Sequence, residues 1–100
     1  MKIYLAGAMR GHKDLNFPVF HRAAQRLRLE GHEVFNPAAA NLEKLPIRRI
    51  FFHDTQYICL EADAVALLPG WGKSKGARAE KALAEAIGLT VIRLAREKNK

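Results

Sequence analysis

The chain has a single cysteine, Cys59, and no long apolar run in its 100 residues. One cysteine excludes an intrachain disulfide and fits a reducing cytoplasm, which is where we expect the protein to be. No apolar stretch approaches the roughly 18 residues that a membrane span needs, so we expect no membrane partner. The first apolar stretch is interrupted early by Gly7 and Arg10, which favours a strand over a signal peptide.

Acidic residues are also scarce, with 10 Asp and Glu against 17 Lys and Arg and a net charge of +7. Such a balance raises the question of nucleic-acid binding. The basic residues are scattered, however, and no basic stretch is interleaved with aromatic residues as single-strand binding would require. We therefore expect no nucleic-acid partner, although a positive surface would attract a phosphorylated small molecule.

The length allows one small domain, which we assign to residues 1–95, followed by a polar tail at 96–100. The 49% of apolar residues suits a globular fold, but the core of so short a chain is modest. We therefore expect a homodimer or a larger homo-oligomer. The subunit contact is predicted on the apolar segment that holds Ile50, Phe51, Phe52 and Tyr57.

Strand-like and helix-like segments alternate along the chain. Asn16 is expected to cap the first helix, and glycines end the first and third helices. The expected elements are strands at Lys2–Ala6, His32–Phe35, Ala64–Leu68 and Thr90–Leu94, helices from Phe17 to Gly31, Pro46–Ala62 and Gly76–Ile87, and a loop at Ala38–Leu45. The expected apolar stripes are Ile47, Ile50, Phe51 and Ile58 on the second helix, and Ala79, Ala82, Leu83, Ala86 and Ile87 on the third.

This alternation predicts a three-layer α/β fold, Rossmann-like or flavodoxin-like, with about four parallel strands in the order 2-1-3-4. Ligands of such sheets bind beyond the carboxyl ends of the strands, at the switch point between the first and third strands. The loops at 7–12 and 69–75 would meet there. Both loops are rich in Gly and in basic or hydroxyl residues.

The first loop offers two candidate binding residues. Gly7 would allow a ligand to approach the backbone closely, and Arg10 could bind a phosphate or a carboxylate. A tight turn with a solvated Arg10 is the alternative.

Asp54 falls on the apolar stripe of the second helix, three and four residues after Phe51 and Ile50. An ionised carboxylate is costly there, so Asp54 is either paired or held for proton transfer with a raised pKa. The alternative is a carboxylate at the edge of the stripe that meets water or Arg49. Asp63 precedes a strand, and we expect it to fix the turn between helix and strand.

The segment from Ser74 to Glu80 begins the third helix. Ser74 could cap this helix, donate to a phosphate, or do both, and Gly76 lets the backbone close on a ligand. Glu80 is expected in or near the first turn, where the helix dipole favours its ionised form. An ionised carboxylate there can act as a nucleophile toward an anomeric carbon, or it can simply pair with Lys81 or Arg78.

The four histidines have no ligand-like spacing to one another or to Cys59, so we predict no metal site and no cofactor. His12 and His53 are close enough to the candidate site to contact a ligand, although surface positions are the simpler reading.

Four motifs cover nearly the whole chain: Ile3-Tyr-Leu-Ala-Gly-Ala-Met-Arg-Gly11, Asn16-Phe-Pro-Val-Phe20, Gly31-His-Glu-Val-Phe-Asn-Pro37, and the segment from Ala62 to Glu80. Together they resemble the nucleoside 2-deoxyribosyltransferase superfamily, and within it the small phage and bacterial branch called DUF4406. The resemblance implies that the ligand is a nucleotide or a nucleoside.

In the enzymes of that superfamily a Glu attacks C1′ of the sugar, a helix Asp donates a proton to the base, and a first-strand Tyr positions the nucleophile. Glu80, Asp54 and Tyr4 match these positions, so the resemblance implies catalytic roles for them. A Ser at the position of Ser74 is typical of the deoxynucleoside 5′-monophosphate N-glycosidases, where it binds phosphate. Substrate-binding roles are implied for Gly7, Ala8, Met9, Arg10, Pro69, Gly70, Trp71, Ser74 and Gly76.

Two functions remain open from the sequence. The first is hydrolysis or transfer at the N-glycosidic bond of (deoxy)nucleoside 5′-monophosphates through a Glu nucleophile. The alternative is a non-catalytic module that binds, senses or sequesters a nucleotide. Both use the same anion-binding loops, and they differ in whether Glu80 forms a covalent bond.

Overall fold

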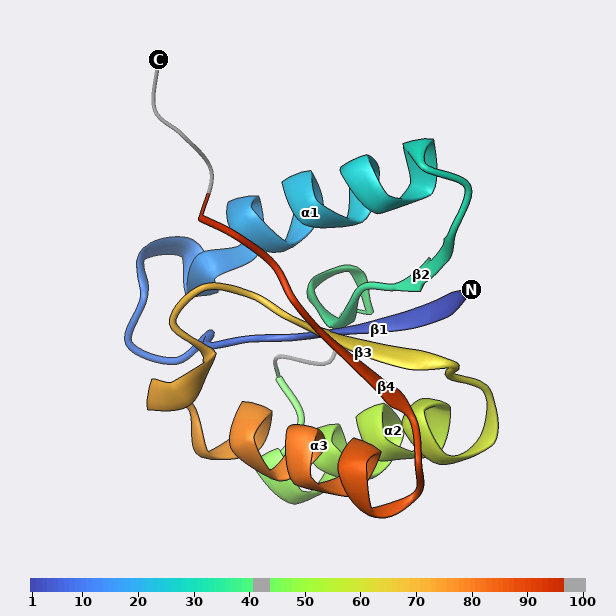
Figure 1. Cartoon of the computed structure of the whole chain (residues 1–100). Coiled ribbons are helices and arrows are strands. Elements are labelled where there is room, and N and C mark those ends of the chain that lie inside the picture. The colour runs from blue at the N-terminus through green and yellow to red at the C-terminus, as the bar shows by residue number, and fades with distance from the viewer. Residues whose placement is uncertain (41–43, 97–100) are drawn as a thin grey trace.

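The computed structural model describes residues 1–40 and 44–96, so parts of the expected loop and tail, at 41–43 and 97–100, lie outside the described residues. Four parallel strands form one sheet in the order β2-β1-β3-β4, which confirms the predicted topology. Helix α1 covers one face of the sheet, and α2 and α3 cover the other (Figure 1). The elements are β1 (Lys2–Ala6), α1 (Phe17–Leu29), β2 (Glu33–Phe35), α2 (Ile47–Leu60), β3 (Ala64–Leu67), α3 (Lys75–Ala86) and β4 (Thr90–Arg93).

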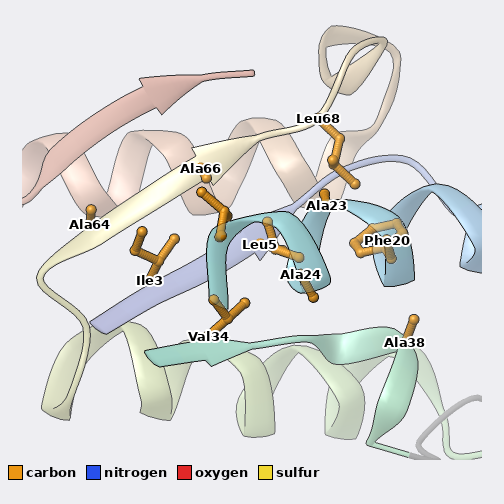
Figure 2. Packing of buried hydrophobic residues seen from close by; sticks show 11 residues of the cluster. Ile3, Leu5, Phe20, Ala23, Ala24, Val34, Ala38, Ala64, Ala66 and Leu68 are labelled. Carbon is orange, nitrogen blue, oxygen red and sulfur yellow. The ribbon is translucent and has the colours of Figure 1, made fainter. Parts of the chain in front are cut away.

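Strands β1 and β3 form the centre of the sheet, and nearly all of their side chains are buried. Successive side chains of a strand point to opposite faces, so the two strands contribute to two separate cores. Figure 2 shows the cluster on the α1 side. It contains Ile3, Leu5, Phe20, Ala23, Ala24, Leu27, Val34, Ala38, Ala64, Ala66 and Leu68. The cluster on the α2 and α3 side contains Tyr4, Ala6, Ile58, Val65, Leu67, Ala77 and Ala84.

Gly7 follows β1 at the point where the α1-side core ends. A Cβ atom added there would lie 2.9 Å from Leu68 Cδ1 and 3.2 Å from Phe20 Cζ, so a larger residue would displace these side chains. Core packing therefore favours a glycine at position 7, in addition to the close approach of a ligand expected from the sequence.

The start of α1 differs from the prediction. Asn16 has a left-handed backbone (φ 63°), and its side chain makes no capping bond. Its Nδ2 instead donates to the Ala8 carbonyl at 3.0 Å and so ties the helix start to the first loop. A short 3₁₀ segment, Lys13–Asn16, precedes the helix. Within it, Asp14 and Leu15 also have a left-handed backbone, so the chain turns sharply there.

The predicted apolar stripe of α2 is wrong in its first half. Ile47 is 62% exposed and Phe51 37% exposed, whereas Asp54 and Ile58 are buried. The amino-terminal half of α2 therefore leaves apolar side chains uncovered while a carboxyl group is buried.

The predicted stripe of α3 is wrong as well. Its buried residues are Ala77, Glu80 and Ala84, whereas Ala79, Ala82, Ala86 and Ile87 are exposed. The small side chains of Ala77 and Ala84 let the helix approach the sheet closely, and Glu80 lies between them on the same face. A prediction of the buried face that considers apolar residues alone could not include Glu80.

Among the described residues, no helix has the length and apolar character needed to cross a bilayer.

Candidate active site

A cavity of about 430 Å³ lies at the carboxyl ends of β1 and β3. We call it the acid cavity. The first loop, the first half of α2 and the start of α3 all contribute to its lining. The loops after β1 and β3 lie at the same end of the sheet in Figure 1. Because the chain leaves β1 toward α1 and leaves β3 toward α3, on the opposite face, this edge is the switch point where open parallel sheets bind ligands.

Tyr4 and Glu80 form a buried hydrogen bond at the wall of the acid cavity. The Tyr4 hydroxyl donates to Glu80 Oε2 at 2.8 Å, joining the first strand to α3. Burial, followed by the negative charge of Glu80, raises the pKa of Tyr4 well above its ordinary value of 10.0. Tyr4 therefore stays protonated and acts as a donor at neutral pH.

Asp54 brings a second carboxyl group to the same wall from α2. Its side chain is 6% exposed, and within the described residues its Oδ1 atom has no hydrogen-bond partner. Burial raises the pKa of Asp54 to about 6, while hydrogen bonding from Tyr4 and the charge of His53 act in the opposite direction. A buried oxygen without a donor is costly, and a ligand in the cavity could supply the missing donor.

Glu80 lies in the second turn of α3, further from the helix start than expected. Burial raises the pKa of Glu80 to about 8, opposed by the Tyr4 hydrogen bond and reinforced by the charge of Asp54. The expectation that the helix dipole keeps Glu80 ionised is therefore wrong, because burial outweighs the dipole at this depth. Burial thus favours the protonated form of both carboxyl groups, and that of Glu80 more strongly.

Ser74 caps α3, as predicted. Its Oγ accepts a hydrogen bond from the Ala77 amide at 3.1 Å, and its hydroxyl proton remains available to a further acceptor. Arg10, Lys75 and Gly76 line the acid cavity together with Ser74. A helix start with a hydroxyl donor and basic side chains favours an anionic group at this end of the cavity.

Most residues predicted for the site line this one cavity. The exceptions come from the loop after β3: Pro69 and Gly70 line a different cavity, and Trp71 does not line the acid cavity. Trp71 instead lies below two cations, with Lys81 Nζ 5.7 Å and Arg93 Cζ 5.5 Å from its ring centre. The predicted residues in the acid cavity are Tyr4, Gly7, Ala8, Met9, Arg10, Asp54, Ser74, Gly76 and Glu80.

Several lining residues were not predicted from the sequence. Lys73 and Lys75 border the acid cavity, and their place in a Gly-rich basic loop was an available signal. Ile47 and Phe51 border it because the first half of α2 is not packed on the sheet. Asp63 has a structural role, as expected, but through a different contact: its side chain accepts from the Lys2 amide at 2.8 Å and ties the turn before β3 to the start of β1.

No group of three or more His, Cys, Asp or Glu side chains within residues 1–40 and 44–96 is placed to hold a metal ion. The acid cavity itself is lined by carboxyl, hydroxyl and basic side chains, among others.

The fold and this cavity define a small parallel α/β domain with two buried carboxyl groups at its switch point. The chain belongs to the family described as a domain of unknown function, DUF4406, whose sequence model matches residues 1–93. A comparison with curated proteins finds no match.

Proposed function

We propose that the protein cleaves or transfers at the N-glycosidic bond of (deoxy)nucleoside 5′-monophosphates, as a relative of the nucleoside 2-deoxyribosyltransferase superfamily. One observation carries the proposal: the Tyr4 hydroxyl donates to the buried Glu80 carboxyl group at 2.8 Å, and the buried Asp54 carboxyl group lies at the wall of the same cavity. These three residues come from β1, α3 and α2, and they match the superfamily's positioning Tyr, nucleophile and acid.

The phosphate of the substrate would lie at the start of α3. Support comes from the Ser74 hydroxyl, the first amide groups of the helix, and Arg10 across the cavity. Charge-assisted hydrogen bonds of this kind are worth roughly 1.5–3 kcal/mol each. Nucleotides should therefore bind more tightly than the corresponding nucleosides.

The reaction would proceed in two balanced steps. In the first, a Glu80 carboxylate oxygen bonds to C1′, the C1′–N bond breaks, and its electron pair goes to the base as Asp54 protonates the leaving nitrogen. In the second, ionised Asp54 takes a proton from water or from an incoming base. That nucleophile bonds to C1′ and releases the Glu80 carboxylate.

This sequence of steps requires a proton to move from Glu80 to Asp54 before the attack. Tyr4 could relay it if its hydroxyl turned from Glu80 to Asp54, gave its own proton to Asp54 and accepted the proton of Glu80. The net charge of the pair does not change in such a transfer, which keeps its energetic cost low in a buried site.

The test is to incubate the protein with nucleoside and deoxynucleoside 5′-monophosphates and with the unphosphorylated nucleosides, and to measure free base by chromatography. We expect base release from at least one monophosphate and less from its nucleoside. Glu80→Ala should abolish release. Glu85→Ala is the matched control on the same helix, because Glu85 is exposed and pairs with Lys81 at 2.7 Å. Release that survives Glu80→Ala unchanged would contradict the covalent mechanism.

One observation favours a second candidate, the non-catalytic nucleotide binder. The pKa of Glu80 is raised to about 8, which leaves its nucleophilic form in the minority at neutral pH. Binding of a nucleotide without base release from any substrate tested would select this candidate.

The assembly expected from the sequence remains our proposal: a homodimer formed through α2. Its support is the exposed apolar surface of that helix, where Phe52 is 53% and Leu60 75% exposed. Ile47 and Phe51 extend this surface to the acid cavity. Sedimentation at micromolar concentration should show a dimer, Phe52→Glu should give a monomer, and Leu29→Glu on α1 should leave the dimer intact. A monomeric wild type would contradict the proposal.

A further inference from the structure

A second cavity, of about 540 Å³, lies on the other face of the sheet at the same edge. We call it the basic cavity. Val19 and Ala23 of α1 and Leu68 after β3 give it an apolar floor, and the end of β4 closes one side through Leu94. Its volume is within the range of small-molecule sites.

Four permanently charged side chains line the basic cavity: Arg22, Arg26, Lys73 and Arg96. They come from three separate parts of the chain, α1, the loop after β3 and the segment after β4. Among the described residues that line the cavity, none is acidic. Cations gathered over an apolar floor create a strong positive potential, which attracts an anion.

The basic cavity adjoins the acid cavity, because His12 and Lys73 line both. The two cavities therefore share part of their wall, so a ligand bound in one lies close to the other. Within the described lining there is no aromatic Phe, Tyr or Trp side chain on which the bases of a long strand could stack. The observations thus favour a compact ligand over a nucleic acid.

We propose that the basic cavity binds a further phosphate group of the ligand whose sugar lies at Glu80, so that the ligand is a nucleotide with more than one phosphate. The location of the sugar rests on the proposed function, whereas the anion site rests on the cavity itself. The second phosphate belongs either to a polyphosphate chain or to a second nucleotide.

Isothermal titration calorimetry in about 0.15 M salt tests the proposal, since weak surface attraction is screened there. The probes are deoxyadenosine 5′-mono- and triphosphate, the dinucleotide with a 5′-phosphate, inorganic phosphate and inorganic triphosphate. We expect inorganic triphosphate to bind about tenfold tighter than phosphate, as one added charge-assisted bond predicts. Preference for the nucleoside triphosphate would indicate a polyphosphate chain, and preference for the dinucleotide a second nucleotide.

Two exposed arginines provide a matched pair of variants. Arg26→Gln should weaken triphosphate binding about fivefold, by losing one exposed charge contact, and should weaken phosphate binding less, because a single phosphate can also bind at the start of α3. Arg48→Gln removes the same charge from α2, outside both cavities, and should change neither.

Equal affinity for phosphate and triphosphate, or equal losses in the two variants, would overturn the proposal. Affinity that keeps rising for oligonucleotides longer than two residues would overturn it in favour of a nucleic-acid surface. If the protein releases base but shows no preference for ligands with more than one phosphate, the proposed function stands and the basic cavity has no part in it. If it shows that preference but releases no base, the anion site stands and the proposed catalysis does not.

Discussion

The two faces of the sheet are built from alternate residues of the same strands, yet they have different chemistry. On the α1 face, Ile3 joins a buried cluster composed of apolar residues. On the other face its neighbour Tyr4 bonds to Glu80, and Asp54 is buried beside them. A shift of one position along β1 therefore separates a residue that stabilises the fold from one that belongs to the candidate site.

The two faces therefore contribute differently, one mainly to the stability of the fold and the other to the reactivity of the candidate site. The apolar cluster gains free energy from burial alone, which does not depend on pH. Buried carboxyl groups lose solvation, and their pKa values rise as a result. The α2 and α3 face should therefore carry the pH dependence of the protein, and the α1 face should carry its pH-independent stability.

Among the effects that distinguish the two faces, and after the loss of release in Glu80→Ala, the largest is that of Asp54→Asn on base release. The amide cannot give up a proton to the leaving base, so the rate should fall by about 10²–10⁴, the usual contribution of general acid catalysis. Single-turnover measurement of free base checks this value. Asp63→Asn is the control, since that side chain serves a turn at the other end of the strands. If both variants keep the wild-type rate, Asp54 is not the acid.

The fold was largely predictable because its signals are local and periodic. The unbroken apolar run from Ala64 predicted a strand buried on both faces, and all four residues of β3 are buried. The start of α3 was also predictable, because Ser74 is a strong capping residue in front of an alanine-rich segment.

The next effect concerns stability and pH. The folded protein raises the pKa of Glu80 from 4.5 to about 8, so the unfolded chain loses this proton at lower pH. The free energy of unfolding should therefore fall as pH rises from about 4.5 to 8, and Asp54 should add to the fall up to about pH 6.

Glu80→Gln should remove the larger part of the pH dependence of the free energy of unfolding. The variant should match the wild type at pH 4.5 and exceed it by about 2 kcal/mol at pH 8.5, where the wild type buries a charge. Urea unfolding at both pH values measures the difference. Glu85→Gln, which changes an exposed carboxylate, should show no such gain. A gain of equal size at both pH values would show that burial of charge is not the cause.

The burial of Glu80 was not predictable from α3 alone. The residues Ala79, Ala82 and Ala86 form as good a stripe as Ala77 and Ala84, and only the contact with Tyr4 decides between them. That contact joins residues far apart in the sequence. For the same reason the ionised state of Glu80 was predicted wrongly, since its depth in the fold depends on which face of α3 is buried.

The smallest effect should come from the α1 face. Ile3 is fully buried beside Ala64 and Leu5, and Ile3→Val removes one methylene group without adding a polar atom. The loss should be about 1 kcal/mol in the free energy of unfolding, and it should be the same at pH 4.5 and pH 8.5. Base release should be unchanged, because the side chain of Ile3 points away from the acid cavity toward α1 (Figure 2). Urea unfolding and the base-release assay on one preparation check both statements. A pH-dependent loss, or a slower reaction, would mean that the two faces of the sheet are coupled and that stability and reactivity are not separated between them.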